Sequence, residues 1–332
     1  MLRVILFFSV LFSLGGGVAA EALASGAEAG VSGELRARAR HDDANGREPI
    51  NRVQDRYVLN GYVSFGKQDC YSVKVRAATG SRFNSVWNDT SLSDGDRDGP
   101  FNLRNAWFGL NCIGSSRHIE FGDIRAISTG EFGANNDGWV DLGVRYVENN
   151  EATGVSWVVT AGGIDPDGLE QPDLFSRNHG DYNYAQFHLT KKYQNKIKTV
   201  ADLSVFDSSV YFRTSNIFPV DNYSDFIDHL NVDVLFVESN LQGYLVRIDK
   251  TIKEWIVQFG ITDRREFRGK EGSERLPDRG FLGNGENFQF IFGKKNALGP
   301  VDFRFRARKG DAPFRFEVDF RYRFNWVDEF SY

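Results

Sequence analysis

The chain has 332 residues, with 45 acidic side chains against 40 basic ones and a formal net charge of −5 at pH 7. The lack of an overall positive excess argues against nucleic acid as a partner. The mean hydropathy of −0.40 argues against a bundle of membrane helices. It does not exclude a β-barrel, in which half of each strand is polar, and 29 Phe, 12 Tyr and 6 Trp against one Met favour that alternative.

The first 24 residues have the pattern of a secretory signal peptide. Arg3 supplies one positive charge, an apolar run covers residues 4–14, and small residues follow. This run is short for a helix that must cross ~30 Å of hydrocarbon, so an uncleaved membrane anchor is the weaker alternative. We expect cleavage after Ala20 or Ala24 and a single mature domain at 25–332.

Strand-like segments follow at a spacing of roughly 20 residues, separated by turn residues. Apolar and polar side chains alternate in them, which predicts extended strands, whereas no helical period is convincing. Fifteen segments are clear: 33–40, 56–65, 71–78, 103–111, 117–123, 140–148, 154–163, 184–193, 198–206, 229–238, 243–250, 254–263, 287–295, 300–309 and 314–326. A segment at 209–218 makes sixteen.

Loop lengths alternate between these segments. The connections at 66–70 and 112–116 are short, whereas those at 81–102 and 124–139 are long. Short turns at one end and long loops at the other are typical of a bacterial outer-membrane barrel. The sequence therefore predicts an all-β fold, a transmembrane antiparallel β-barrel of 16 strands.

The last segment shows which face meets which environment. Phe314, Phe316, Val318, Phe320, Tyr322, Phe324 and Trp326 alternate with charged or polar residues. A strand of a soluble sheet also alternates, with its charged face in bulk water. In a barrel the aromatic face contacts lipid and the charged face lines a water-filled lumen.

Several stretches resemble the general, non-specific porins of Gram-negative bacteria. "LRNAWFGLN" with "HIEFGDIR" is similar to a hairpin of that family, "TGEFGANNDG" to its inward-folded third loop, and "DLGVRY" to the strand after that loop. Phe330 and Tyr332 resemble the aromatic terminus of the family's last strand, its assembly signal. The resemblance implies a 16-stranded barrel with an inward third loop, an outer-membrane homotrimer in contact with lipid and lipopolysaccharide, and passage of small hydrophilic solutes and ions.

Basic side chains gather on the polar faces of four predicted strands. They are Arg36, Arg38, Arg40, Lys74, Arg76, Arg304, Arg306, Arg308, Arg315, Arg321 and Arg323. In a closed barrel the first and last strands are neighbours, so these residues would form one basic wall. Glu34, Asp302, Glu317 and Asp319 offset it only in part. A solvated outer face is the alternative, but inside a pore such a wall sets the local field.

Acidic residues lie in or beside the predicted third loop. The resemblance implies that Glu131, Asp137 and Asp141 face the basic wall across the pore constriction; Glu131 matches the family motif directly and the two aspartates match by neighbourhood. Asp94, Asp96 and Asp98 have calcium-loop spacing, but Asn105 stands where a loop of that kind has Glu. A solvated loop tip is the favoured interpretation there, and weak divalent-ion contact stays open.

Cys70 and Cys112 are the only cysteines. Export to an oxidising compartment favours a disulfide, since two thiols alone cannot complete a zinc site. If the strands that they flank are antiparallel neighbours, both residues lie at the periplasmic end within disulfide reach. The five His show no ligand spacing, and the motifs of hydrolases, phosphate loops and dinucleotide sites are missing from the sequence.

The prediction is thus an outer-membrane porin without catalysis, cofactor or bound metal, which passes solutes by diffusion. Two alternatives stay open. One is a channel selective for anions, phosphate or sugars, to which the basic wall points. The other is a secreted β-sandwich that binds glycans.

Overall fold

A computed structural model describes residues 27–43, 49–66, 69–79, 88–89, 101–114, 116–125, 127, 139–164, 182–206, 209–221, 224–265 and 285–330. In these residues the regular elements are all strands. The first half holds β1 (Ala27–Asp42), β2 (Ile50–Phe65), β3 (Tyr71–Ala78), β4 (Asn88–Asp89), β5 (Asn102–Leu110), β6 (Arg117–Arg125), β7 (Trp139–Asn150) and β8 (Val155–Ile164). The second half holds β9 (Tyr182–Lys192), β10 (Lys198–Phe206), β11 (Ser209–Pro219), β12 (His229–Val237), β13 (Asn240–Ile252), β14 (Trp255–Arg264), β15 (Gly285–Leu298), β16 (Val301–Gly310) and β17 (Arg315–Phe330).

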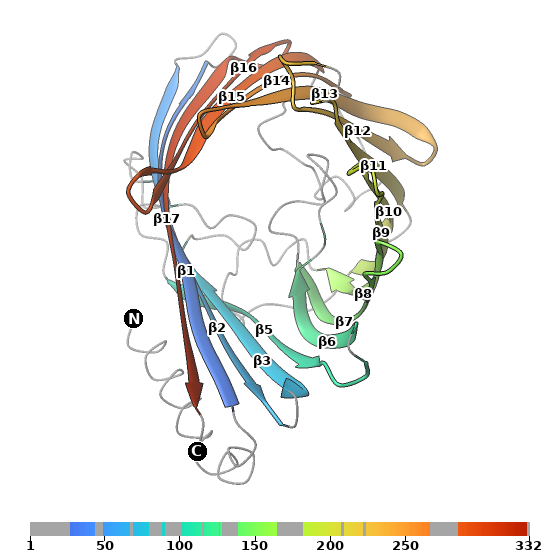
Figure 1. The fold of residues 1–332 in the computed structure, drawn as a ribbon. Coiled ribbons are helices and arrows are strands. Elements are labelled where there is room, and N and C mark those ends of the chain that lie inside the picture. Colours follow the sequence, from blue (N-terminus) through green and yellow to red (C-terminus); the bar gives the residue numbers. More distant parts are fainter. Residues whose placement is uncertain are drawn as a thin grey trace.

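The strands close into one ring of antiparallel pairs (Figure 1). β17 pairs with β1 along its whole length, from Ala27 opposite Phe330 to Asp42 opposite Arg315. β3 pairs directly with β5, while the two-residue β4 pairs with the end of β2. The described residues thus form a barrel of sixteen long strands plus β4. This confirms the predicted barrel and excludes the sandwich, which would need two separate sheets.

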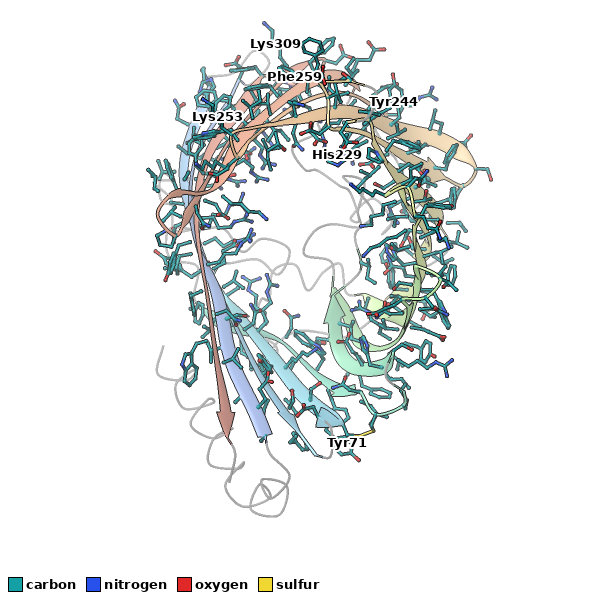
Figure 2. The ribbon with its side chains drawn as sticks, viewed as in Figure 1. Tyr71, His229, Tyr244, Lys253, Phe259 and Lys309 are labelled. Atoms are coloured by element: carbon teal, nitrogen blue, oxygen red, sulfur yellow. A yellow bond between two sulfur atoms is a disulfide. The ribbon has the colours of Figure 1, made fainter. Side chains whose placement is uncertain are left out.

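Burial is inverted relative to a soluble protein. On the neighbouring strands β14 and β15, Phe259 and Phe288 are 54% and 64% exposed, whereas Thr262 and Asn287 are fully buried. Figure 2 shows Phe259 on the outer side of the ring and His229 on the inner side. Alternation along the strands therefore sends most large apolar side chains outward and most polar ones inward, as in a membrane barrel. A few inward positions are apolar, among them Val200, Phe206 and Leu245.

Aromatic side chains pack against one another on the outer face. The rings of Trp255 and Phe292 stack at 4.5 Å, and those of Phe303 and Phe320 lie 5.5 Å apart. Packing of large rings across adjacent strands stabilises the sheet and gives the barrel a continuous apolar exterior. No helix among the described residues is long and apolar enough to span a membrane.

Connections differ from the predicted alternation on one side of the barrel. The loop between β10 and β11 comprises residues 207–208, and the turn between β12 and β13 comprises residues 238–239, although both lie at the end where long loops are expected. Glu238 and Ser239 both have positive φ, as do Lys253 and Glu254 in the next hairpin. Two consecutive positive φ values are the geometry of a tight hairpin turn. Neither turn contains the Asn-Gly pair that would have predicted it from the sequence.

Cys70 and Cys112 form a disulfide in the structure, with Cα atoms 4.5 Å apart. It joins the connection between β2 and β3 to the connection between β5 and β6. Beside it, the backbone N–H of Asn111 donates to the carbonyl oxygen of Cys70 at 2.7 Å. Two turns at one end of the barrel are thereby linked covalently.

Candidate functional site

The candidate site is the inner surface of the barrel, and its most charged part is a wall built by β16, β17, β1, β2 and β3. We call this the basic wall. Its members include all of the predicted basic residues, which lie on one face of their strands: Arg36, Arg38, Arg40, Lys74, Arg76, Arg304, Arg306, Arg308, Arg315, Arg321 and Arg323. Register brings them together, since Arg36 lies opposite Arg321 across the seam where the chain closes.

Two buried carboxylates hold this wall together. Asp319 accepts hydrogen bonds from Arg36 at 2.7 Å and from Arg304 at 3.1 Å. Glu317 forms ion pairs with Arg306 and, at 3.4 Å, with Arg38. The side chains of Asp319 and Glu317 are only 3% and 1% exposed, so each pair of guanidinium groups shares one desolvated acid. Such a network fixes the position of every charge in it.

Acids at either end of the wall repeat this arrangement. Asp42 pairs with both Arg40 and Arg315. Asp302 pairs with Arg321 at 3.0 Å and Arg323 at 3.6 Å. Asp42 lies just beyond the predicted first strand, which is why the sequence did not place it on the wall.

The structure adds two ion pairs that the sequence reasoning missed. Arg56 on β2 donates to Glu34 at 3.0 Å, and Arg145 on β7 donates to Glu120 on β6 at 3.2 Å. Glu34 was already placed on the wall from the sequence, but its partner was not. Side-chain parity within the predicted strands could also have found Arg56, Glu120 and Arg145, because they alternate with outward-facing residues. Lys74 also pairs with Glu120, at 3.5 Å.

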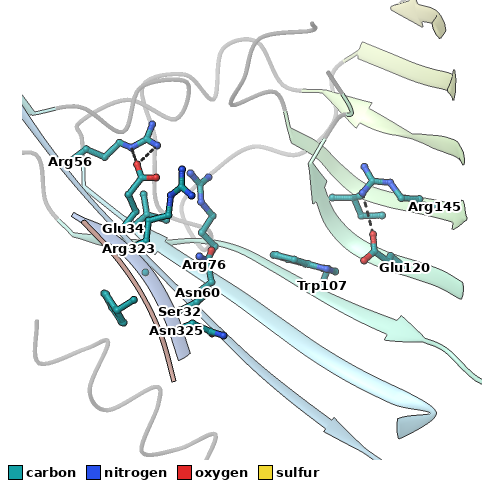
Figure 3. Close-up of a pocket in the computed structure, with 14 residues that line it drawn as sticks. Ser32, Glu34, Arg56, Asn60, Arg76, Trp107, Glu120, Arg145, Arg323 and Asn325 are labelled. Carbon is teal, nitrogen blue, oxygen red and sulfur yellow. Dashed lines mark hydrogen bonds and ion pairs between the residues drawn. The ribbon is translucent and has the colours of Figure 1, made fainter. Parts of the chain in front are cut away.

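Between these pairs lies a recess of about 620 Å³, which extends from the basic wall to β5, β6 and β7. Figure 3 shows the Arg56–Glu34 pair on one side, the Arg145–Glu120 pair on the other, and Trp107 between them. The recess is lined by Ser32, Gly33, Glu34, Arg56, Val58, Asn60, Arg76, Trp107, Glu120, Ile124, Arg145, Arg323, Phe324 and Asn325. A smaller recess of about 180 Å³ lies beside Arg36, Arg304 and Asp319.

The inner face of β9, β10 and β11 is built around one carboxylate, Asp202. Its side chain accepts hydrogen bonds from Arg213 at 3.0 Å and Gln186 at 2.5 Å, and lies 3.4 Å from His188. Gln186 also donates to the carbonyl oxygen of Ile127 at 2.8 Å and accepts from its N–H at 3.1 Å. Ile127 follows β6, so this surface, which we call the anchoring wall, binds the start of the third loop.

The remaining predicted residues fall largely outside the described chain. Glu131, Asp137 and Tyr332 lie outside it, as do the signal peptide at 1–24 and the aspartates at 94–98. Asp141 lies in β7, where its backbone pairs with Gly163, and Phe330 pairs with Ala27. Within the described residues no three His, Cys, Asp or Glu side chains gather as metal ligands would.

Comparisons with known proteins bear on the fold alone. Neither a protein-family model nor a curated protein sequence matches this chain. Among solved structures it is similar to a triple mutant of the Rhodopseudomonas blastica porin, with a TM-score of 0.60 and 10% identity over 89% of this chain and 100% of that one. The chain has the general porin fold.

A second porin supports this. The structure of Salmonella typhi OmpF in a complex with daunomycin matches with a TM-score of 0.58 and 10% identity, over 89% of this chain and 97% of that one. Two porin structures thus share the barrel over nearly their whole length. At such identity a porin fold does not specify which solutes pass, so selectivity has to be argued from the side chains of this barrel.

Proposed function

We propose that this protein is an outer-membrane porin, a channel through which ions and small hydrophilic solutes diffuse. One observation carries the proposal: apolar side chains cover the outside of a closed ring while charged and polar ones line its inside. Lipid accommodates the outer face, and the polar inner face favours water. Diffusion through such a lumen needs neither catalysis nor an energy source.

The proposed constriction lies between the basic wall and acidic residues of the third loop. The paired hydrogen bonds between Ile127 and Gln186 support a loop that turns toward the lumen, because Gln186 is an inward-facing side chain of β9. On this proposal Glu131 faces the basic wall, with Asp137 and Asp141 nearby. Charges in a narrow gap interact more strongly than in bulk water, since little solvent separates them.

The excess of basic side chains predicts a modest preference for anions. Oligomeric state and location are also part of the proposal: a homotrimer in the outer membrane, in contact with lipopolysaccharide. Both rest on the resemblance of the third-loop and terminal motifs and on the porin fold.

The test is a planar-bilayer recording of the purified full-length protein. Stepwise insertion, each step composed of three equal conductance levels, is expected, with a reversal potential on the anion side in a salt gradient. Folding is checked first by the heat-dependent change in electrophoretic migration that closed barrels show. A folded protein that gives no conductance, or that is released from membranes by plain buffer, would overturn the proposal.

A further inference from the structure

We propose that three neighbouring side chains on the inner face of β17, β1 and β2, together with the ring of Tyr62, bind one neutral hexopyranose. The three are Asn325, Ser32 and Asn60, which we call the polar row. This rests on the proposed function, because the row lies in the lumen through which solutes would pass. It gives one class of solute a binding site on the way through the channel.

The register of two strand pairs places the polar row in a line across the sheet. Ser32 on β1 lies directly opposite Asn325 on β17 and, on its other side, directly opposite Asn60 on β2. Opposed residues of antiparallel strands have Cα atoms about 4.5–5.5 Å apart. Figure 3 shows the three side chains close together, in the recess that they help to line. One ring-sized solute can therefore reach the whole row.

The polar row is open to hydrogen bonding. Among the described residues neither its two amides nor its hydroxyl has a side-chain partner, whereas Glu34 and Glu120 of the same recess are each bound to an arginine. An amide can both donate and accept hydrogen bonds, and so can a hydroxyl. Sugar hydroxyls need both functions, whereas a carboxylate only accepts. The uncharged row therefore favours a neutral polyol.

An aromatic ring adjoins the row on the same face of the sheet. Tyr62 follows Asn60 by two residues on β2 and lies opposite Gly30 on β1. A Cβ atom at Gly30 would overlap the Tyr62 ring, so this glycine leaves room for the ring to lie against the backbone of β1. The Tyr62 hydroxyl donates to Glu28, which holds the far end of the ring. The ring is thus fixed in place beside the row.

The ring accounts for a cyclic solute. Tyr62 is partly exposed, and within the described part of the chain no other ring packs against it. One face of the ring lies against Gly30, so the other is turned to the lumen. Such a face covers the apolar C–H face of a pyranose, while the hydroxyls at the rim of the sugar reach the row. An open-chain polyol lacks that flat face, and an anion finds no charge in the row.

The experiment measures how glucose, sorbitol and inorganic phosphate block the ion current of the full-length protein in a bilayer. Glucose is expected to reach half-maximal block at a concentration about tenfold below that of sorbitol or phosphate. Tyr62→Leu and Asn60→Ala should each raise that concentration about tenfold. The matched control is Tyr71→Leu on the neighbouring strand: Tyr71 packs against Phe65 and Phe108 on the outer face and should leave the block unchanged.

The outcomes separate this inference from the proposed function. Conductance without block by glucose, or equal block by glucose and sorbitol, overturns the sugar site and leaves the channel intact. Block by phosphate as strong as that by glucose points to an anion site and also overturns it. Saturation-transfer NMR on the detergent-solubilised protein gives a second readout. Transfer from aromatic protons to the C–H protons of glucose, lost in Tyr62→Leu but kept in Tyr71→Leu, supports the site, and equal transfer in both contradicts it.

Discussion

The two sides of the lumen use buried carboxylates for different purposes. On the basic wall Asp319 binds two guanidinium groups, those of Arg36 and Arg304. On the anchoring wall Asp202 binds one, that of Arg213, together with the amide of Gln186. One wall spaces its positive charges along the pore, whereas the other binds a loop.

This difference follows from the number of basic side chains around each carboxylate on the neighbouring strands. The basic wall contains the seam where β17 meets β1. β1 carries Arg36, Arg38 and Arg40 at successive inward positions, and β17 carries Arg315, Arg321 and Arg323 with Glu317 and Asp319 between them. Guanidinium groups so close together repel one another unless an acid lies between them. The anchoring wall carries few charges, so its carboxylate is available to order amides and, through Gln186, the backbone of Ile127.

The largest effect is expected from breaking the seam itself. Deletion of Phe330–Tyr332 removes the pairing of Phe330 with Ala27 and the terminal aromatic residues that resemble an assembly signal. We predict that the outer-membrane level falls steeply and that protein accumulates in the periplasm, as measured by fractionation and immunoblotting. Phe226→Ala, which removes an 86% exposed aromatic residue from a turn, is the control and should assemble normally. Normal abundance of the truncated chain would refute the prediction.

Removing one acid from each wall compares them directly. Asp319→Asn leaves Arg36 and Arg304 side by side without their shared carboxylate, and loss of one partner of a buried ion pair costs about 3–5 kcal/mol. Asp202→Asn removes the carboxylate from one guanidinium group, that of Arg213, which keeps a hydrogen bond to Ser204. Urea unfolding in detergent micelles should therefore show the larger loss for Asp319→Asn. Equal losses would mean that the two acids have the same structural role.

The disulfide lies at the end of the strands that adjoin the basic wall. Replacing Cys70 and Cys112 together by Ser should lower the free energy of unfolding by about 2–4 kcal/mol, because the bond closes a long loop of the chain. Urea unfolding measures this, with dithiothreitol treatment of the parent protein as the matched condition. Mass spectrometry should find no free thiol in protein purified without reductant. Two free thiols would contradict the bond.

Ion selectivity tests the charge of the basic wall. Arg38→Ser together with Arg76→Ser should shift the reversal potential toward cations and raise the conductance, because two inward-facing guanidinium groups are removed. Glu131→Gln should shift it toward anions. Lys309→Ser is the control: it removes one positive charge on the outer side of the barrel (Figure 2) and should leave the potential unchanged. If neither lumen variant shifts the potential, these residues do not line the constriction.

The smallest effect is expected on the anchoring wall. Gln186→Ala removes both hydrogen bonds to the backbone of Ile127, each worth about 0.5–1.5 kcal/mol. Open-channel current noise should increase while mean conductance changes little. Gln289→Ala, which removes a buried glutamine from β15, is the matched control and should show the same open-channel current noise as the parent protein. Equal noise in both variants would mean that Gln186 does not position the loop.

The sequence by itself determined the barrel and the two faces of each strand. The segment 314–326 predicts β17 (Arg315–Phe330) with its aromatic side chains outward, because side-chain direction alternates with a period of two whatever the strand pairs with. The weaker segment at 209–218 likewise becomes β11 (Ser209–Pro219). The local alternation of apolar and polar residues was enough to predict these strands, since each face of a strand meets one environment along its whole length.

Tertiary structure alone decided which side chains meet. Arg36 contacts Asp319 rather than its direct neighbour Arg321 because of the tilt and register of the seam, and Gln186 reaches Ile127 across three strand pairs. The tight turn at Glu238 and Ser239 carries no turn signal, and its backbone conformation is imposed by the strands on either side. Register depends on closure of the whole ring, and no local segment encodes it.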